Sequence, residues 1–287
     1  MLTTLKDLLE KAEAGKYAVG AFNVPSLEGV MAVLSAAEDL KQPVIIQFAQ
    51  VHESIVPLNV IGPVMVREAE KASVPVCVHL DHGQDLLYLE QALDLGFTSI
   101  MLDGSKYPFE ENVRRTREAA SLAHKRGASL EGEIGVMATQ DNGKGDASGN
   151  NIYTDPKMAG EFAAATEVDA LACSFGTVHG MYLSTPKLDF PRISEIRKEI
   201  HKLPIVMHGG SGVSPEDYRK VISRGVRKIN YYTYMALAGG EGARKIYEEN
   251  SKDVLFHDVM GAVISAMKAD VTKTIKVFSE PEPKIIE

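Results

Sequence analysis

The chain alternates between short apolar runs and longer amphipathic segments along most of its length. Each apolar run is rich in Val, Ile, Leu and Ala and ends in Gly, Asn, Asp or His, and the segment after it is rich in Glu, Lys and Ala. This alternation is typical of β-strands joined by α-helices. Eight strands are expected, at 17–24, 43–49, 75–81, 99–103, 129–134, 170–175, 204–208 and 228–232.

The segments between these runs have the spacing of amphipathic helices. Apolar residues recur there three and four positions apart, and capping residues or prolines mark several starts, as in Asp155-Pro156 and Ser214-Pro215. Helices are expected at 27–40, 85–95, 108–126, 155–166, 190–202 and 215–224, with two more after the last strand, from 234 to about 250 and from about 253 to 273.

The strand pattern also indicates how the units are arranged. Strands that are almost continuously apolar are buried on both faces, as parallel strands covered by helices are. Eight such units in roughly 250 residues fit a closed (β/α)8 or TIM barrel better than an open doubly wound sheet of about five or six strands. The sequence therefore predicts an α/β fold in which residues 1–287 form one barrel domain, with residues 234–287 as a C-terminal helical extension and candidate oligomer interface.

Composition narrows the classes of protein that fit. Lys plus Arg total 31 against 39 Asp plus Glu, a net charge of -8, which argues against a nucleic-acid partner. Cys77 and Cys173 lie inside apolar runs, as free cysteines do in a reducing compartment. The first twenty residues interleave charged and apolar positions, and no apolar run has membrane-spanning length. A cytoplasmic protein without a membrane partner is expected.

One stretch of low hydrophobicity, residues 139–151, is rich in Gly, Asn and Asp and follows the fifth strand. Its length is that of a loop, and the preferred interpretation is a mobile active-site loop. A surface insertion without a role in the site is the alternative.

Chemistry in such a barrel lies on the loops that follow the strands, and three of these ends carry a histidine followed by glycine: His82, His179 and His208. Because the strand ends converge on one mouth, the three can share a metal, and three imidazoles with an open fourth position are typical of catalytic zinc. Singly, each could be an ordinary turn or packing residue. His79 is expected to support the ligands from behind, and the other histidines to be surface or structural groups: His52, His124, His201 and His257.

Three carboxylates stand at neighbouring strand ends. Asp81 precedes the ligand candidate His82 and is best placed to act as a general acid and base, with a turn-capping role as the alternative. Asp103 and Glu133 either orient histidines or hold a second cation, a choice that spacing alone leaves open.

The seventh strand end offers a candidate anion site. In Gly209-Gly210-Ser211-Gly212, successive backbone N–H groups can form a nest for a phosphate, next to the N-terminus of a helix that starts near Ser214. Loops after the seventh and eighth strands commonly bind phosphate in these barrels. Asn230 and Thr233, at the eighth strand end, strengthen this interpretation, whereas a simple Gly-rich turn is the alternative.

Together these motifs resemble those of the class II, metal-dependent ketose-bisphosphate aldolases. The similarity runs from residue 5 to about residue 278, and the motifs occur in the order of the family: AFN at 21–23, HLDHG at 79–83, LDGS at 102–105, GTVHG at 176–180, HGGSG at 208–212 and KIN at 228–230.

The resemblance implies an activity and a set of residue roles. It implies one catalytic zinc ion per subunit on His82, His179 and His208, Asp81 as the catalytic acid and base, and a second divalent position at Asp103 and Glu133 or a monovalent cation near the phosphate. The expected reaction is reversible cleavage of a fructose- or tagatose-type ketose 1,6-bisphosphate to dihydroxyacetone phosphate and a three-carbon aldehyde, in carbohydrate metabolism such as glycolysis, by a homodimer or homotetramer. The residues expected to bind substrate and phosphate are Asn23, Gly180, Gly209, Gly210, Ser211, Asn230, Tyr231, Tyr232 and Thr233.

The chain departs from the family pattern at two positions. Related enzymes carry a glutamate in the loop after strand five that protonates the substrate carbon, and Asp141 is the nearest equivalent here. After strand eight, fructose-bisphosphate aldolases have Asn-x-Asp-Thr and tagatose-bisphosphate aldolases an Ala in place of that Asp, whereas this chain has Tyr232. A phenol there is expected to change which aldehyde fits. Segment 182–190 looks more like the tagatose branch, and a ketose 1-phosphate modified at C6 is the alternative substrate.

Three rival functions share parts of this pattern. A Schiff-base aldolase needs a lysine at the barrel mouth, but Lys228 begins its strand and Lys106 lies beyond the strand-four turn. A metal-dependent sugar-phosphate isomerase or epimerase can use the same barrel and phosphate nest. A non-catalytic barrel subunit is expected to have lost the metal ligands, which this chain keeps.

Overall fold

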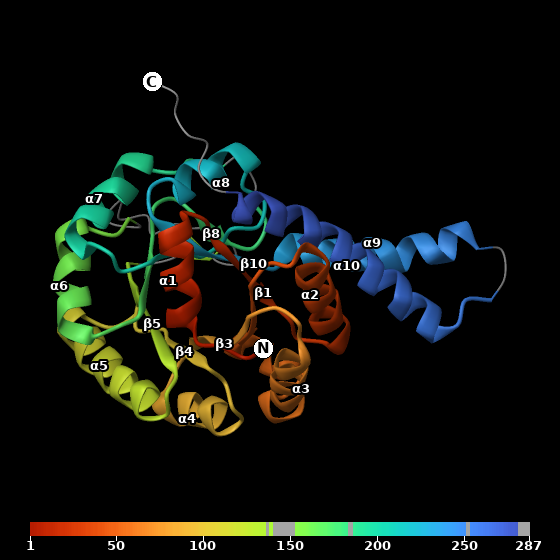
Figure 1. Cartoon of the computed structure of the whole chain (residues 1–287), viewed down its shortest axis with the longest axis horizontal. Coiled ribbons are helices and arrows are strands. Elements are labelled where there is room, and N and C mark those ends of the chain that lie inside the picture. Colours follow the sequence, from red (N-terminus) through yellow and green to blue (C-terminus); the bar gives the residue numbers. More distant parts are fainter. Residues whose placement is uncertain (136–137, 140–152, 183–185, 251–252, 281–287) are drawn as a thin grey trace.

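Eight parallel strands close into a barrel in a computed structural model that describes residues 1–135, 138–139, 153–182, 186–250 and 253–280. The strand order around the barrel is β1-β10-β9-β7-β5-β4-β3-β2, and Figure 1 shows the helices arranged around it. The predicted (β/α)8 barrel is confirmed. Its strands are β1 (Val19–Asn23), β2 (Val44–Ala49), β3 (Val76–Gly83), β4 (Ser99–Leu102), β5 (Ser129–Ile134), β7 (Ala170–Cys173), β9 (Ile205–Met207) and β10 (Val226–Tyr231).

The helices of the outer ring begin at side-chain caps that the sequence provides. The side chains of Ser26, Asp85, Asp155 and Ser214 each accept a hydrogen bond from a backbone N–H in the first turn of the helix that follows, which satisfies a donor that the helix itself cannot pair. The ring consists of α2 (Leu27–Leu40), α3 (Leu58–Lys71), α4 (Leu86–Asp94), α5 (Phe109–Lys125), α6 (Pro156–Thr166), α7 (Phe190–Ile200) and α8 (Pro215–Ile222).

The N-terminal segment forms a helix, α1 (Leu5–Gly15), that the strand-and-helix pattern did not predict. Its buried residues Leu5, Leu8, Leu9 and Ala12 pack against the first residues of barrel strands, such as Val19 of β1. The helix therefore closes the end of the barrel opposite the strand C-termini. The spacing of its three buried leucines and one buried alanine could have predicted this helix, because it matches one face of a helix.

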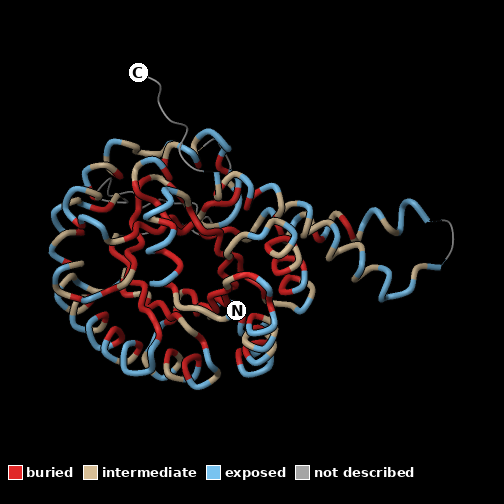
Figure 2. Tube along the Cα trace, in the orientation of Figure 1, coloured by how far each residue is buried: buried red, intermediate tan, exposed pale blue. Residues whose placement is uncertain are grey.

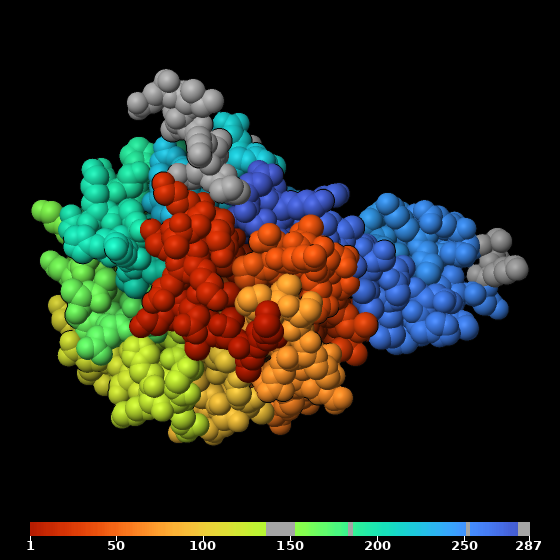
Figure 3. Space-filling model, in the orientation of Figure 1, coloured from red at the N-terminus to blue at the C-terminus, as the bar shows by residue number. Residues whose placement is uncertain are grey.

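Two further helices follow the last strand, as the sequence predicted. They are α9 (Thr233–Glu249) and α10 (Phe256–Ser279), and α10 continues beyond residue 273. Near its end, Val271, Ile275 and Phe278 are buried against the barrel, which explains the longer helix. The pair projects beside the barrel in Figures 1 and 3. No helix in the described part of the chain combines the length and the apolar character needed to cross a membrane.

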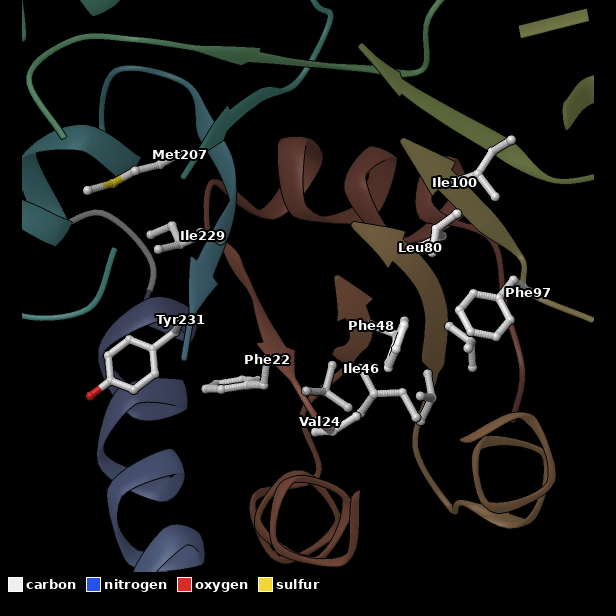
Figure 4. Packing of buried hydrophobic residues seen from close by; sticks show 14 of the residues in the cluster. Phe22, Val24, Ile46, Phe48, Leu80, Phe97, Ile100, Met207, Ile229 and Tyr231 are labelled. Atoms are coloured by element: carbon white, nitrogen blue, oxygen red, sulfur yellow. The ribbon is translucent and has the colours of Figure 1, made fainter. Parts of the chain in front are cut away.

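The two faces of the strands bury different kinds of side chain. Figure 2 shows that burial concentrates along the strands, and in Figure 4 Phe22, Ile46 and Leu80 pack in an apolar layer with other buried residues. The alternate positions turn into the barrel and are polar near the strand ends. In register, Asn23 pairs with Gln47, Gln47 with His79, Ala49 with Asp81, and Ala21 with Asn230.

Two short elements lie near the mouth outside the barrel. A 3-10 helix, η1 (Gln50–Ser54), follows β2, and β6 (Ala138–Thr139) pairs in parallel with β8 (Val178–His179). The sequence placed His179 at the end of the sixth barrel strand, but that strand, β7, ends at Cys173. His179 is carried instead by β8, after a turn at Gly176 with φ of 110°.

Candidate metal centre and active site

His82, His179 and His208 converge at the mouth of the barrel. Their ring centroids are 4.9 Å apart for His82 and His179, 4.7 Å for His82 and His208, and 5.7 Å for His179 and His208. Each offers a nitrogen, and the three nitrogens lie within 4.8 Å of one another. Because Zn–N bonds are about 2.0–2.1 Å long, one ion can reach all three with small adjustments.

An unusual backbone conformation brings His82 to the mouth. Adjacent strand residues normally point to opposite faces, yet both Asp81 and His82 line the same cavity. His82 has a φ of 49°, in the left-handed region, and the register of β3 with β4 shifts between Leu80 and Gly83. Such a backbone conformation costs conformational energy, and strained residues of this kind are common at functional sites.

Asp103 sets the orientation of the His82 ring. Its Oδ2 lies 3.0 Å from Nδ1 of His82, and its Oδ1 accepts hydrogen bonds from the backbone N–H and the hydroxyl of Ser105. Nε2 of His82 is buried and has no hydrogen-bond partner among the described residues. The ring is therefore held at one nitrogen and free to bind a ligand at the other, as metal-binding histidines are.

His208 is held in the same way from inside the barrel. Its Nε2 lies 2.8 Å from Oε1 of Glu131, whose Oε2 accepts a hydrogen bond of 2.7 Å from Nζ of Lys228. Nδ1 of His208 is buried without a partner in the described part of the chain. Glu131 and Lys228 are both fully buried, so the ion pair stands behind the metal ligand. Lys228, one of the two lysines considered for a Schiff base, is thus held in a buried ion pair.

His79 supports this interior network, as the sequence indicated. Its Nδ1 lies 2.8 Å from the Ser99 hydroxyl, and its Nε2 lies 3.7 Å from Oε2 of Glu131. Glu131 was not predicted to be a functional residue. The signal was available, because Glu131 and Glu133 alternate on β5 and point to the same side of the strand.

Glu133 lies between the histidines and is 2% exposed. Its Oε2 is 3.8 Å from Nδ1 of His82 and 3.9 Å from Nδ1 of His208, and has no hydrogen-bond partner within the described residues. Burial raises the pKa of Glu133 to about 8, with the neighbouring carboxylates adding to the rise against the opposing charge of His82. With His82 and Asp103 it forms a second group of potential metal ligands.

The electrostatics of the mouth favour a cation. Burial opposes a charge on His82, but Asp81, Asp103 and Glu133 raise its pKa to about 10. In contrast, burial lowers the pKa of His179 to about 3, with the other two imidazoles contributing. Neutral imidazole is the form that binds a metal, and the surrounding carboxylates supply negative charge to balance it.

Three side-chain amides hold Asp81. Its Oδ2 accepts hydrogen bonds from Asn23 at 3.0 Å and Gln47 at 3.3 Å, and its Oδ1 accepts one from Asn230 at 3.1 Å. Burial opposes ionisation, but the charges of His82 and of the residues behind it hold the pKa of Asp81 well below its usual range. The carboxylate is thus ionised and fixed in place. Gln47 was missed because it lies in the middle of the apolar run that forms β2.

Most of the predicted phosphate-binding residues lie after β9 and β10 and line the cavity at the mouth. Gly209 has a φ of 62°, and a Cβ there would lie 2.2 Å from the carbonyl oxygen of Val178, so only glycine fits. The Gly210 N–H donates to the Asn230 carbonyl, and the hydroxyl of Ser211 accepts from the Tyr232 N–H. The N-terminus of α9, at Thr233, begins beside them, which adds amide donors for an anion.

Most of the predicted site residues line one cavity of about 630 Å³, whereas His208 and Gly210 are not among the residues that line it. The ring of Tyr231 lies 5.8 Å from that of Phe22 (Figure 4), and the ring of Tyr232 lies 4.9 Å from that of His52. His52 was expected to be a surface or structural group, but it lines the cavity and is 9% exposed.

Asp141 lies outside the described residues. The predicted site residues that line the cavity are Asn23, Asp81, His82, Asp103, Glu133, His179, Gly180, Gly209, Ser211, Asn230, Tyr231, Tyr232 and Thr233.

The chain is similar along nearly its whole length to several known aldolases. The chain is 37% identical over 283 residues, 96% of each chain, to a fructose-bisphosphate aldolase of Geobacillus stearothermophilus. It is 39% identical over 274 residues, 95% of each chain, to a sulfofructosephosphate aldolase of Alkalicoccus urumqiensis. The crystal structure of the YdjI aldolase from Escherichia coli K12 matches 99% of both chains with a TM-score of 0.87 and 34% identity. A model of the class-II fructose-bisphosphate aldolase family matches residues 3–282, and the chain therefore belongs to that family.

Proposed function

We propose that this class II aldolase uses zinc and reversibly cleaves a ketose 1,6-bisphosphate of the fructose or tagatose type into dihydroxyacetone phosphate and a three-carbon aldehyde. The observation that carries the proposal is the convergence of His82, His179 and His208 beside the ionised carboxylate of Asp81. Aldol cleavage requires a metal that stabilises the developing negative charge and a base that moves a proton.

The donor set fits zinc. Nε2 of His82 and Nδ1 of His208 are buried nitrogens without partners in the described part of the chain, and each is the free end of a ring whose other end is held. Three imidazoles with an open position are the usual ligands of catalytic zinc. When bound, zinc supplies positive charge that stabilises the negative charge developing on the substrate oxygens during cleavage. Asp103 and Glu133 offer a position for a second divalent cation.

Asp81 then moves the proton of the C4 hydroxyl. In cleavage its carboxylate takes that proton as the C3–C4 bond breaks, and in condensation it returns the proton to the aldehyde oxygen. The amides of Asn23, Gln47 and Asn230 orient the carboxylate. By resemblance, Asp141 delivers the proton to the substrate carbon. The triose phosphate is bound by Gly180, Gly209, Ser211 and Thr233, where backbone amides and the start of α9 meet.

A ketose 1-phosphate with another group at C6 is the second candidate substrate. The similarity to a sulfofructosephosphate aldolase supports it, as does Tyr232, which lines the cavity where related enzymes carry Asp or Ala. The two candidates share the transferred half of the substrate and differ only in the aldehyde.

We also propose a cytoplasmic homodimer or homotetramer acting in carbohydrate metabolism such as glycolysis. Both cysteines are free and buried, in keeping with a reducing compartment. Large apolar side chains are exposed on α9, on α10 and in the link between them, as they are at an interface between copies of a chain. These are the side chains of Leu237, Tyr247, Leu255 and Phe256. Light scattering of the purified protein measures the number of subunits.

An assay of dihydroxyacetone phosphate release tests the proposed function. Purified enzyme is given fructose 1,6-bisphosphate, tagatose 1,6-bisphosphate or a C6-modified ketose 1-phosphate, before and after exhaustive chelation and again after zinc is restored. We expect release that stops on chelation and returns with zinc. Substrate conversion without any triose phosphate would support an isomerase or epimerase instead, and release that survives chelation but is lost on borohydride reduction would support a Schiff-base mechanism.

A further inference from the structure

His52 and Tyr232 form one wall of the active-site cavity. His52 lies on η1, directly after β2, and Tyr232 directly follows β10. Because β2 and β10 both pair with β1, the two side chains approach each other across the end of β1. Their ring centroids are 4.9 Å apart, and Phe48 lies against the His52 ring at 6.3 Å.

This wall adjoins the side of Asp81 that faces away from the metal ligands. Ala49, three residues before His52, pairs in register with Asp81, and the charge of Asp81 acts on the His52 ring. The predicted phosphate residues Gly209 and Ser211 lie instead after β9. A substrate held by its phosphate there and by Asp81 at C4 therefore extends its remaining carbons, those of the aldehyde half, over β1 and β2 toward His52.

The imidazole of His52 has unused hydrogen-bonding capacity. Its Nδ1 is buried and has no partner among the residues that the structure describes, although buried polar atoms are paired in the great majority of cases. Burial also lowers the pKa of His52, against the charge of Asp81, so the ring is neutral near pH 7 and carries one donor and one acceptor.

A hydroxyl suits this ring better than an anion does. A neutral imidazole can both donate to and accept from a hydroxyl. The charged side chains that line the cavity, apart from histidines, are the carboxylates of Asp81, Asp103 and Glu133, with no Lys or Arg among the lining residues that the structure describes. A second phosphate or other anion would therefore be repelled close to His52 and must lie farther out.

We propose that His52 is a specificity-determining residue that hydrogen-bonds a hydroxyl group of the aldehyde half of the substrate, with the ring of Tyr232 fixing the orientation of the imidazole. The proposal rests on the aldolase function proposed above and adds the recognition of the non-transferred half. The enzyme thereby distinguishes hydroxylated aldehydes from deoxy aldehydes of similar size, because an aldehyde without the hydroxyl leaves the buried imidazole unpaired.

Condensation with a series of aldehydes tests the proposal. The zinc-loaded enzyme is given dihydroxyacetone phosphate with glyceraldehyde, 2-hydroxypropanal or propanal, which carry two, one and no hydroxyl groups. His52→Phe keeps an aromatic ring against Tyr232 and removes both ring nitrogens. We expect kcat/KM for the best hydroxylated aldehyde to fall about tenfold to hundredfold, with propanal changing less than about threefold and the KM for dihydroxyacetone phosphate unchanged.

Two further variants separate recognition from packing. His52→Gln keeps a donor and an acceptor and is expected to recover part of the preference for hydroxylated aldehydes, while His52→Met is a second apolar variant should Phe fail to fold. His257→Phe changes an exposed histidine, with 75% of its side chain accessible, and is expected to leave every rate unchanged. Thermal melting and metal content are measured for each variant.

The outcomes are distinguishable. An equal loss for all three aldehydes in His52→Phe, or an unchanged preference, overturns the role of His52 in recognition. Failure of the aldolase proposal itself looks different, because the unmodified enzyme would then form no condensation product with any aldehyde.

Discussion

The two sides of the barrel mouth hold their side chains by different forces. On the side of β3, β5 and β9, His82 and His208 are each fixed by a carboxylate, Asp103 and Glu131. On the side of β1, β2 and β10, neutral amides and aromatic rings predominate, as in the hydrogen bond from Gln47 to Asn23 at 2.9 Å. Asp81 lies between them, with imidazole charge on one side and amide donors on the other.

The difference shows how a fixed carboxylate can be combined with a metal site. Charged partners bind strongly when buried but leave an uncompensated charge when one is removed. Neutral amides cost less to lose, about 1–3 kcal/mol for each buried group left unpaired. Changes on the metal side should therefore have large effects on metal content and stability, and changes on the amide side should act more mildly and chiefly on the rate.

The largest effect is expected from removing a proposed metal ligand. His208→Ala deletes one of three converging imidazoles and leaves Glu131 with the hydrogen bond from Lys228 and with His79 at 3.7 Å. We expect the variant to lose most of its zinc, measured by elemental analysis, and to lose turnover by more than about a thousandfold.

His257→Ala serves as the control for that change, because this histidine is exposed. If His208→Ala kept its zinc content, the metal would have to be bound elsewhere, and a non-catalytic role for the barrel would again have to be considered.

The second largest effect is expected from replacing Asp81, which lies between the two sides of the barrel mouth. Asp81→Asn keeps the size of the side chain and removes the base, so we expect kcat to fall by about 10²–10⁴-fold while zinc content and melting temperature stay close to those of the parent. Steady-state kinetics in both directions, together with elemental analysis, check this. Retained turnover would show that another group moves the C4 hydroxyl proton.

Replacing Glu131 is expected to weaken metal binding without replacing a proposed metal ligand. Glu131→Gln removes the charge that pairs with the fully buried Lys228, and breaking such a pair costs about 3–5 kcal/mol. Loss of the carboxylate behind His208 should also lower zinc affinity by about 10–100-fold. Chemical denaturation and zinc titration with a competing chelator measure the two effects.

A double variant tells these effects apart. Glu131→Gln with Lys228→Met removes the unpaired charge and should recover stability, but not zinc affinity, because His208 still lacks its carboxylate. If zinc affinity returned along with stability, Glu131 would act only through packing of the barrel interior.

Much of the metal side could be predicted from the sequence. His82 and His208 stand where apolar strands end, and strand C-termini converge in a barrel whatever their separation in sequence. The part that differed was local: His179 was expected at the end of the sixth barrel strand and lies instead on the separate short strand β8. A four-residue strand, β7, followed by a glycine turn cannot be distinguished by pattern from a longer strand.

Less of the amide side could be predicted. The hydrogen bonds from Asn23 and Asn230 to Asp81 join residues 58 and 149 positions apart, and they depend on the stagger of neighbouring strands, which sequence spacing does not report. Both asparagines were predicted to bind substrate, but their bonds to the carboxylate were not. His52 follows β2 in a segment whose 3-10 turn gave no periodic signal, so its place in the cavity was missed.

Gln47 provides the mildest test of the comparison, because among the described residues its side chain hydrogen-bonds to Asn23 and Asp81 and to none of the proposed metal ligands. It is fully buried and donates to both Asp81 and Asn23. Gln47→Leu fills similar space but leaves Asn23 Oδ1 without this donor and Asp81 with two amide donors. We expect about 1–2 kcal/mol lower stability and a kcat reduced about threefold to tenfold, with zinc content unchanged.

Gln91→Leu, at an exposed helical position, is the matched control. An unchanged kcat would show that Asn23 and Asn230 suffice to orient the carboxylate, whereas loss of zinc would mean that the two sides of the mouth are mechanically coupled through Asp81 rather than held independently.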